Sequence, residues 1–104
     1  MKSIEQGDII RIDKGRVPFL VVSSSLYNQS GMAVVCPIVS KASDDAMHVP
    51  IHGKNVEGVV LCEQLASVSV SGRGYSRKDH LFPEAFLEVV YRVQSIFDYY
   101  PHAE

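Results

Sequence analysis

Short apolar segments rich in β-branched residues, separated by turn residues, fill the first three-quarters of this 104-residue chain. Short strands at this kind of spacing are typical of all-β barrels and sandwiches. We expect strands over residues 9–12, 19–23, 32–39, 48–51, 56–62 and 67–71. Because an open sheet exposes unpaired edges that invite aggregation, the pattern predicts a closed or nearly closed barrel.

The patterns of two of these segments also predict which faces of the strands are buried and where strand pairing is interrupted. Residues 32–39 are apolar almost throughout, which is typical of a strand buried on both faces. Pro37 within this segment predicts a bulge or a local break in pairing. Residues 67–71 alternate between serine and valine, which predicts a strand with one face in water.

The last quarter of the chain changes to a helical period. Pro83 suits a first helical turn, and the apolar residues that follow are Phe86, Val90, Val93 and Phe97. Spacings of four, three and four place them on one face of a helix. A chain of this length has room for one core. We therefore predict one domain over residues 1–104, a mainly β barrel with a single C-terminal α-helix.

Charge and hydropathy exclude some classes of function. The formal net charge of −2 argues against broad electrostatic capture of nucleic acid, although a local basic patch remains compatible with it. No apolar run approaches the roughly 20 residues that span a bilayer, and the N-terminal residues lack the apolar core of a signal peptide. We expect a cytoplasmic protein that has no membrane partner.

Cysteine and histidine do not form a metal-binding pattern. Cys36 and Cys62 lie in separate apolar segments without a CxxC motif, so we expect two small buried hydrophobic residues. His48 and His52 stand four apart and should point to the same side of a strand, but no further ligands accompany them. We therefore expect neither a metal nor a cofactor.

A basic segment follows the serine–valine strand. Arg73, Arg77 and Lys78 surround Tyr75, and a second small basic turn stands at residues 14–16. Positive charge beside an aromatic ring suits single-stranded nucleic acid, because it neutralises phosphates and stacks bases. The alternative is a plain solvated turn, and these residues alone do not decide between the two.

Six short motifs stand in order along the chain: GDIIRID (Gly7 to Asp13), PFLVVS (Pro18 to Ser23), YNQSGM (Tyr27 to Met32), PIVS (Pro37 to Ser40), EGVVLCEQL (Glu57 to Leu65) and GRG (Gly72 to Gly74). In this order they resemble the motifs of the MazF/PemK family, the CcdB-like toxins of type II toxin–antitoxin systems. The resemblance implies an SH3-like β-barrel with a C-terminal helix that forms a two-fold homodimer. It also implies a metal-independent endoribonuclease that cuts single-stranded RNA and is inhibited by a cognate antitoxin protein.

The positions that carry catalysis in that family have changed in this chain. The family's Arg before the Pro of the second strand corresponds to Val17, and its Thr of Pro-Ile-Thr corresponds to Val39. Neither side chain exchanges a proton. The family's long first loop shrinks to Lys14-Gly15-Arg16, and the Arg-x-Asp that part of the family uses reads Leu61-Cys62-Glu63.

Substitutes stand near the changed positions. We predict that Glu63 acts as the base and Arg16 as the cation or acid of RNA cleavage. Ser40 is a third candidate; because a one-residue shift turns a side chain to the opposite face, it needs a bulge at Pro37. The predicted RNA-binding residues are Arg73, Arg77, Lys78, Asn28 and Tyr27.

The loss of the usual catalytic pair supports an alternative hypothesis. In it the chain is a catalytically degenerate family member, which serves as a binding module for RNA, an antitoxin or another protein. The aromatic tail residues Phe97, Tyr99 and Tyr100 support a dimer under both hypotheses. We expect these rings to pack on the barrel or across the two-fold axis.

Overall fold

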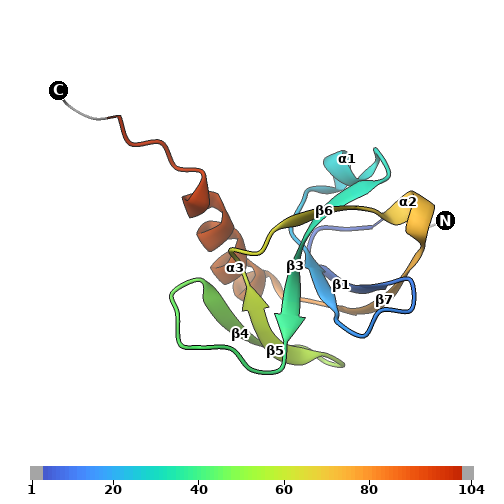
Figure 1. Ribbon diagram of the computed structural model, residues 1–104, viewed down its shortest axis with the longest axis horizontal. Helices are drawn as coiled ribbons and strands as arrows, with labels where there is room; N and C mark the ends of the chain where they lie inside the picture. Colours follow the sequence, from blue (N-terminus) through green and yellow to red (C-terminus); the bar gives the residue numbers. More distant parts are fainter. Residues whose placement is uncertain (1–3, 102–104) are drawn as a thin grey trace.

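The computed structural model describes residues 4–101, which form a strongly curled antiparallel sheet and a C-terminal helix (Figure 1). The elements are β1 (Asp8–Ile12), β2 (Phe19–Val21), α1 (Ser25–Asn28), β3 (Met32–Val39), β4 (His48–His52), β5 (Glu57–Leu61), β6 (Ala66–Ser69), α2 (Val70–Arg73), β7 (Tyr75–His80) and α3 (Pro83–Ile96). The strands pair in the order β4-β5-β3-β2-β1-β7, and β6 pairs with β3 off this path. The predicted mainly β fold with one C-terminal helix is confirmed, as a half-barrel.

The long strand β3 is the centre of the sheet because both of its edges are paired. One edge pairs with β2, and the other pairs with β6 from Met32 to Val35 and with β5 from Ile38 onward. Pro37, which has no N–H to donate, stands in the gap between β6 and β5. The β2–β3 ladder keeps one register through Pro37. The predicted local break is therefore present, and it is not a bulge.

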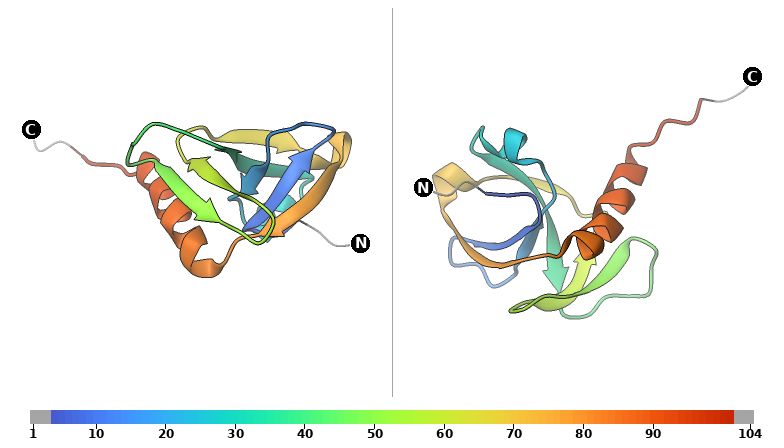
Figure 2. Two further views of the ribbon diagram at one scale, coloured as in Figure 1. Left: turned by 90° about the horizontal axis from the view of Figure 1, so that it is seen from below. Right: turned by 180° about the vertical axis from the view of Figure 1, so that it is seen from behind.

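Strands β1, β2 and β3 bury both of their faces. Ile9, Leu20 and Cys36 belong to a buried cluster with Val89 and Val93 of α3. The neighbouring residues Ile10, Val21 and Val35 belong to a second cluster, together with Val70. Figure 2 shows the geometry that separates the two clusters: α3 lies beside the β4–β5 hairpin, outside the curl formed by β1, β3, β6 and β7. Burial on both faces explains why these strands are apolar almost throughout.

The region from Ser67 to His80 differs from the prediction in two ways. The serine–valine alternation ends at Ser69, because the Ser69 hydroxyl accepts the backbone N–H of Gly72 at 3.2 Å and begins the short helix α2. Within the basic segment, Tyr75, Arg77 and Lys78 lie on the strand β7, which pairs with β1, whereas Arg73 ends α2. The alternative of a plain turn is therefore wrong for the residues of β7. β7 is an edge strand with mostly exposed side chains, so it lacks the apolar alternation that marks a strand.

The helix α3 is confirmed, and its buried residues are Val89 and Val93. Phe86 and Val90 of the predicted stripe are half-buried. Phe97 is 71% exposed, and Tyr99 and Tyr100 are 83% and 75% exposed. The chain beyond α3 runs away from the barrel (Figure 1). Of the two predicted arrangements, packing on the barrel of the same chain is therefore wrong, and packing across the two-fold axis stays a prediction.

The two cysteines are free and buried, as predicted. Burial raises the pKa of the Cys36 thiol to about 12 and that of the Cys62 thiol to about 11. Within residues 4–101, no helix is long and apolar enough to cross a membrane. The same residues hold no group of three or more His, Cys, Asp or Glu side chains placed to hold a metal ion.

Candidate functional site

A groove of about 490 Å³ opens where the turn after β1, the end of β3 and the start of β5 meet. Its apolar lining residues are Val17, Pro18, Ile38, Val39 and Val56. Its polar lining residues are Arg11, Arg16, Ser40, Asn55 and Glu57. Apolar surface interrupted by a few convergent polar groups is typical of a ligand site. This mixture suits a nucleotide, whose base is apolar on its faces and whose phosphate is anionic.

The groove contains the two positions to which the sequence resemblance assigns the catalytic pair of the family. Val17 and Val39, the two positions that replace the family's Arg and Thr, both line it. Ser40 lines it as well, as the first residue after β3. Ser40 therefore reaches the groove because the strand has ended, and the bulge that the sequence argument required is unnecessary.

The arginines of this groove differ from the other arginines of the chain. Arg73 pairs with Asp13 at 2.9 Å, Arg77 with Asp8 at 2.8 Å, and Arg92 with Glu88 at 3.0 Å. Within the described part of the chain, Arg11 and Arg16 form no ion pair, and both line the groove. Two uncompensated guanidinium groups at one hollow attract an anion, and their planar N–H forks fit the oxygens of a phosphate.

Local structure places these two side chains on the groove. Arg11 is the exposed position of a strand whose other residues are buried, so strand alternation directs it outward. After Ile12 the chain turns back tightly: Gly15 donates its N–H to the Ile12 carbonyl at 2.9 Å, and Asp13 takes a left-handed φ of 55°. This turn brings Arg16 to the groove that Arg11 faces.

The third wall of the groove, the turn between β4 and β5, is held by Asp79 of β7. Its carboxylate accepts the backbone N–H of Asn55 at 2.7 Å and that of Val56 at 3.0 Å. Partial burial alone would raise the pKa of Asp79. Hydrogen bonds from backbone N–H groups outweigh this effect and hold the pKa below its ordinary value; the donors are Asn55, His80, Val56 and Lys54. A Cβ on Gly53 would collide with the same carboxylate, so glycine is required there.

The two glutamates near β5 lie at opposite ends of that strand. Glu57 begins β5 and lines the groove, whereas Glu63 follows its end and does not line it. Strand geometry puts Leu61 about 14 Å from Glu57, and Glu63 lies beyond Leu61. Glu63 instead contacts His48 at 3.1 Å, and hydrogen bonds to the Ser43 carbonyl and to Glu63 raise the pKa of His48. The structure therefore brings Arg16 and Ser40 together and leaves Glu63 apart from them.

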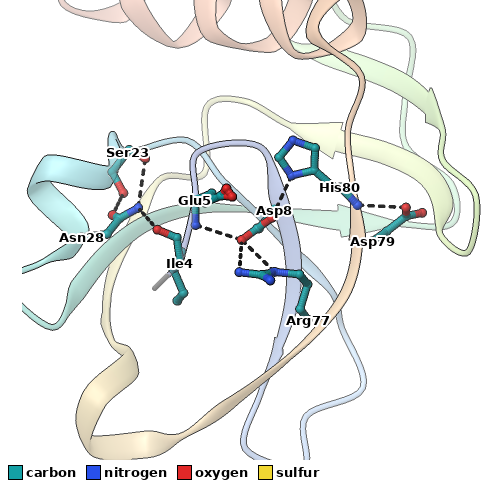
Figure 3. A network of polar contacts seen from close by, with 8 residues as sticks. All are labelled: Ile4, Glu5, Asp8, Ser23, Asn28, Arg77, Asp79 and His80. Atoms are coloured by element: carbon teal, nitrogen blue, oxygen red, sulfur yellow. Dashed lines mark hydrogen bonds and ion pairs between the residues drawn. The ribbon is translucent and has the colours of Figure 1, made fainter. Parts of the chain in front are cut away.

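Among the predicted RNA-binding residues, Arg77 belongs to a partly buried network centred on Asp8 (Figure 3). The Asp8 side chain is only 3% exposed, and its carboxylate accepts the Arg77 Nε–H at 2.9 Å and the Glu5 backbone N–H at 2.8 Å. His80 Nδ1 lies 2.8 Å from the other Asp8 oxygen. Burying a carboxylate requires such partners, so this guanidinium joins β7 to β1.

Asn28 has a similar structural role (Figure 3). It is 6% exposed, accepts a hydrogen bond from the Ser23 hydroxyl, and donates to the carbonyls of Ile4 at 3.3 Å and Ser23 at 3.2 Å. Its amide therefore anchors the N-terminal segment to α1. The neighbouring Tyr27 is partly exposed on α1.

The remaining predicted contacts, Arg73 and Lys78, are exposed. Arg73, already paired with Asp13, lines a second hollow of about 570 Å³ together with Lys14 and Tyr75. Lys78 lies on the edge strand β7. The basic segment is therefore divided between α2 and the edge strand β7, and neither residue lines the arginine groove.

Sequence reasoning missed three polar residues of the groove, Arg11, Asn55 and Glu57. Arg11 had a signal, because it is the charged residue inside an apolar β-branched run. Glu57 had a weaker one: it precedes Gly58, and a glycine within a strand marks a close backbone approach. A Cβ on Gly58 would stand 2.6 Å from the Val39 carbonyl oxygen. Nothing local in the sequence marks Asn55, because its position depends on Asp79.

Comparisons with known proteins identify the family of this chain. The family model described as PemK-like, MazF-like toxin of type II toxin–antitoxin system matches residues 5–97. The endoribonuclease toxin MazF of Escherichia coli strain K12 is 28% identical, over 77% of this chain and 81% of its own length.

Solved structures give the same result. The MazE–MazF crystal structure from Deinococcus radiodurans matches with a TM-score of 0.84 and 25% identity, covering 93% of this chain and 98% of that chain. An endoribonuclease in complex with its cognate antitoxin, from a mycobacterial species, matches with a TM-score of 0.80 at 15% identity, covering 95% and 100%, and supports the fold alone. The chain belongs to the PemK-like, MazF-like toxin family of type II toxin–antitoxin systems.

Proposed function

We propose that this protein is a metal-independent endoribonuclease toxin that cuts single-stranded RNA in the groove lined by Arg11 and Arg16. One observation carries the proposal: the two arginines left without ion pairs in residues 4–101 share the groove that holds Val17 and Val39. The names of the relatives support it, since the Escherichia coli protein is an endoribonuclease toxin. The match to residues 5–97 supports one toxin domain.

The chemistry of RNA cleavage assigns a role to each kind of group in the groove. The 2′-hydroxyl attacks the adjacent phosphorus, so negative charge grows on the phosphoryl oxygens in the transition state. Arg11 and Arg16 stabilise that charge, and removing one such donor typically costs about 100- to 1,000-fold in rate. The apolar residues Val17 and Val39 supply surface for the base and ribose.

A two-fold homodimer and a cognate antitoxin complete the proposal. The outer side of α3 carries Leu87 and Tyr91, both exposed, and the exposed Phe97 follows. Such apolar surface marks an interaction site more often than a solvated face. The MazE–MazF structure from Deinococcus radiodurans supports an antitoxin partner. A toxin that cuts messenger RNA works in the cytoplasm.

The dimer is tested by light scattering at micromolar concentration. We expect twice the mass of the chain, and a stable monomer would contradict the dimer. Addition of the protein encoded beside the toxin gene should raise the mass further and stop RNA cleavage.

A second function remains because Val17 and Val39 cannot exchange protons. In that case the protein binds RNA, an antitoxin or another protein in the groove without cutting RNA. The two functions predict the same binding by Arg11 and Arg16 and opposite results for cleavage.

The deciding experiment compares wild type with Arg11→Ala, Arg16→Ala and the matched control Arg92→Gln, which removes a positive charge from α3. Each protein is incubated with a long RNA transcript in the presence of a chelator, and melting temperatures confirm folding. We expect wild type and Arg92→Gln to cut at the same sites, and both groove variants to be slower by about 100-fold or more. Equal rates for all four proteins would refute the location of the site. A folded wild type that binds RNA without cutting it would favour the binding module.

A further inference from the structure

A third hollow, of about 310 Å³, lies beside the arginine groove and shares two residues with it. Ser40 and Glu57 line both the arginine groove and this third hollow, and His52 lines the third hollow. β4, β5 and β3 are neighbours in the sheet, so His52 on β4 and the end of β3 are separated by two strand spacings, about 10 Å. The imidazole of His52 therefore stands in a hollow that shares Ser40 and the Glu57 carboxylate with the groove of the two arginines.

His52 and Glu57 face each other directly. They are partners in the β4–β5 register, and His52 Nδ1 lies 3.3 Å from Glu57 Oε2. When Nδ1–H donates to the carboxylate, the neutral ring keeps its Nε2 lone pair free as a proton acceptor. A carboxylate that orients a histidine in this way is a recurring arrangement in acid–base catalysis.

From this geometry we infer that His52 is the general base of RNA cleavage and that Glu57 is its positioning residue. The inference rests on the proposed endoribonuclease function and identifies the proton acceptor that Val17 and Val39 do not supply. It also replaces Glu63, which lies beyond the other end of β5, with a base in the hollow that shares Ser40 and Glu57 with the arginine groove.

The proton balance of the step is complete. His52 Nε2 takes the proton of the 2′-hydroxyl as the 2′-oxygen bonds to phosphorus. The bond between phosphorus and the 5′-oxygen breaks, and that oxygen takes a proton from water. The hydroxide left behind removes the proton from His52. The products are a 2′,3′-cyclic phosphate and a 5′-hydroxyl, and no water is consumed overall.

The competing explanation is an ordinary cross-strand pair on a surface hairpin. The side chains of His52 and Glu57 are 81% and 75% exposed, and exposed pairs of this kind add little stability. Substituting either residue should therefore leave the fold intact, which makes the catalytic role separable from a structural one. The same hairpin supplies a control at its other end, where His48 of β4 contacts Glu63, which follows β5. The His48 side chain is only 13% exposed, so the melting temperature of this variant is measured as well.

The test uses the full chain as His52→Gln, Glu57→Gln and His48→Gln, with single-turnover cleavage of a long transcript. Binding is measured separately on a 2′-O-methyl RNA, which cannot react. We expect His52→Gln to slow cleavage by about 100- to 10,000-fold with RNA affinity within about twofold of wild type. His48→Gln should cleave at the wild-type rate. The products of wild type should carry 5′-hydroxyl ends that a polynucleotide kinase labels without prior phosphatase treatment.

Glu57 has a readout that does not depend on activity. Side-chain ¹⁵N shifts should show His52 mainly as the Nδ1–H tautomer in wild type and as a tautomer mixture in Glu57→Gln. If wild type cleaves RNA and His52→Gln cleaves equally fast, the inference is wrong and the proposed function stands. If His48→Gln is the slow variant, the base is Glu63 or His48. A folded wild type that leaves all RNA intact overturns the inference and the proposed function together.

Discussion

Asp79 is the residue whose removal should damage fold and site together, because its carboxylate fixes one wall of the groove from another strand. It accepts the N–H groups of Asn55 at 2.7 Å and Val56 at 3.0 Å. Hydrogen bonds to charged groups contribute about 1.5–3 kcal/mol each, and water recovers part of this at a half-exposed site. Asp79→Ala should therefore cost about 2–3 kcal/mol, which lowers the melting temperature of a domain of this size by roughly 10–20 °C.

The same variant should also lose cleavage activity at temperatures where it is still folded, because Asn55 and Glu57 are no longer held at the groove. The control is Asp45→Ala, which removes a carboxylate that accepts only the nearby N–H of Met47, at 2.8 Å, in an exposed loop. Thermal unfolding and RNA cleavage are measured for both. An Asp79→Ala protein with the melting temperature and cleavage rate of wild type would refute the argument.

Acid should act on the same contact. The folded pKa of Asp79 lies below its ordinary value of 3.8, so the folded state favours the ionised form. The stabilisation is therefore complete above the ordinary pKa and is lost as the pH falls through the lowered one. Between pH 5 and pH 2, the melting temperature of wild type should fall more steeply than that of Asp79→Asn.

Three further predictions concern Asn28, Gly58 and the two cysteines. Asn28→Ala should lower the free energy of unfolding by about 1–3 kcal/mol, because the groups that bond to Asn28 lose their hydrogen-bond partner. RNA affinity should stay unchanged. Weaker RNA binding without destabilisation would instead show that Asn28 contacts RNA. Gly58→Ala should destabilise by about 1–3 kcal/mol through overpacking, because its Cβ meets the Val39 carbonyl at 2.6 Å, and an unchanged melting temperature would contradict that crowding. Cys36 and Cys62, with pKa values of about 12 and about 11, should react with a thiol reagent only on unfolding, and fast labelling of the native protein would contradict their burial.

The strands and the helix were predictable because burial imposes a period on the sequence. β3 was predicted with its observed bounds, since a strand buried on both faces is apolar at nearly every position. β7 was missed because its charged residues show no such period. Their positions are set by partners far away in the sequence: Arg77 pairs with Asp8, and Asp79 accepts a hydrogen bond from the β4–β5 turn. A short stretch of sequence contains only one partner of each such contact, so the contact cannot be predicted from that stretch.

The residues of the candidate site likewise include some that the sequence predicted and some that it did not. Arg16 and Ser40 were found because they adjoin the positions that the family motifs mark. Glu57 and His52 were missed because their relation to Arg16 arises only when β4, β5 and β3 pair side by side. Glu63 was chosen from its motif position, and the strand that carries it places it at the far end.

The central claim is that RNA lies in the arginine groove, and amide shift mapping tests it most directly. The cut sites of a long transcript are first read from its 5′-hydroxyl ends, and a 2′-O-methyl oligonucleotide spanning one site is titrated into ¹⁵N-labelled protein. We expect the largest shift changes at Arg16, Ser40 and residues 55–57, with β7 little affected. Changes concentrated on Tyr75–His80, with the groove silent, would contradict the account.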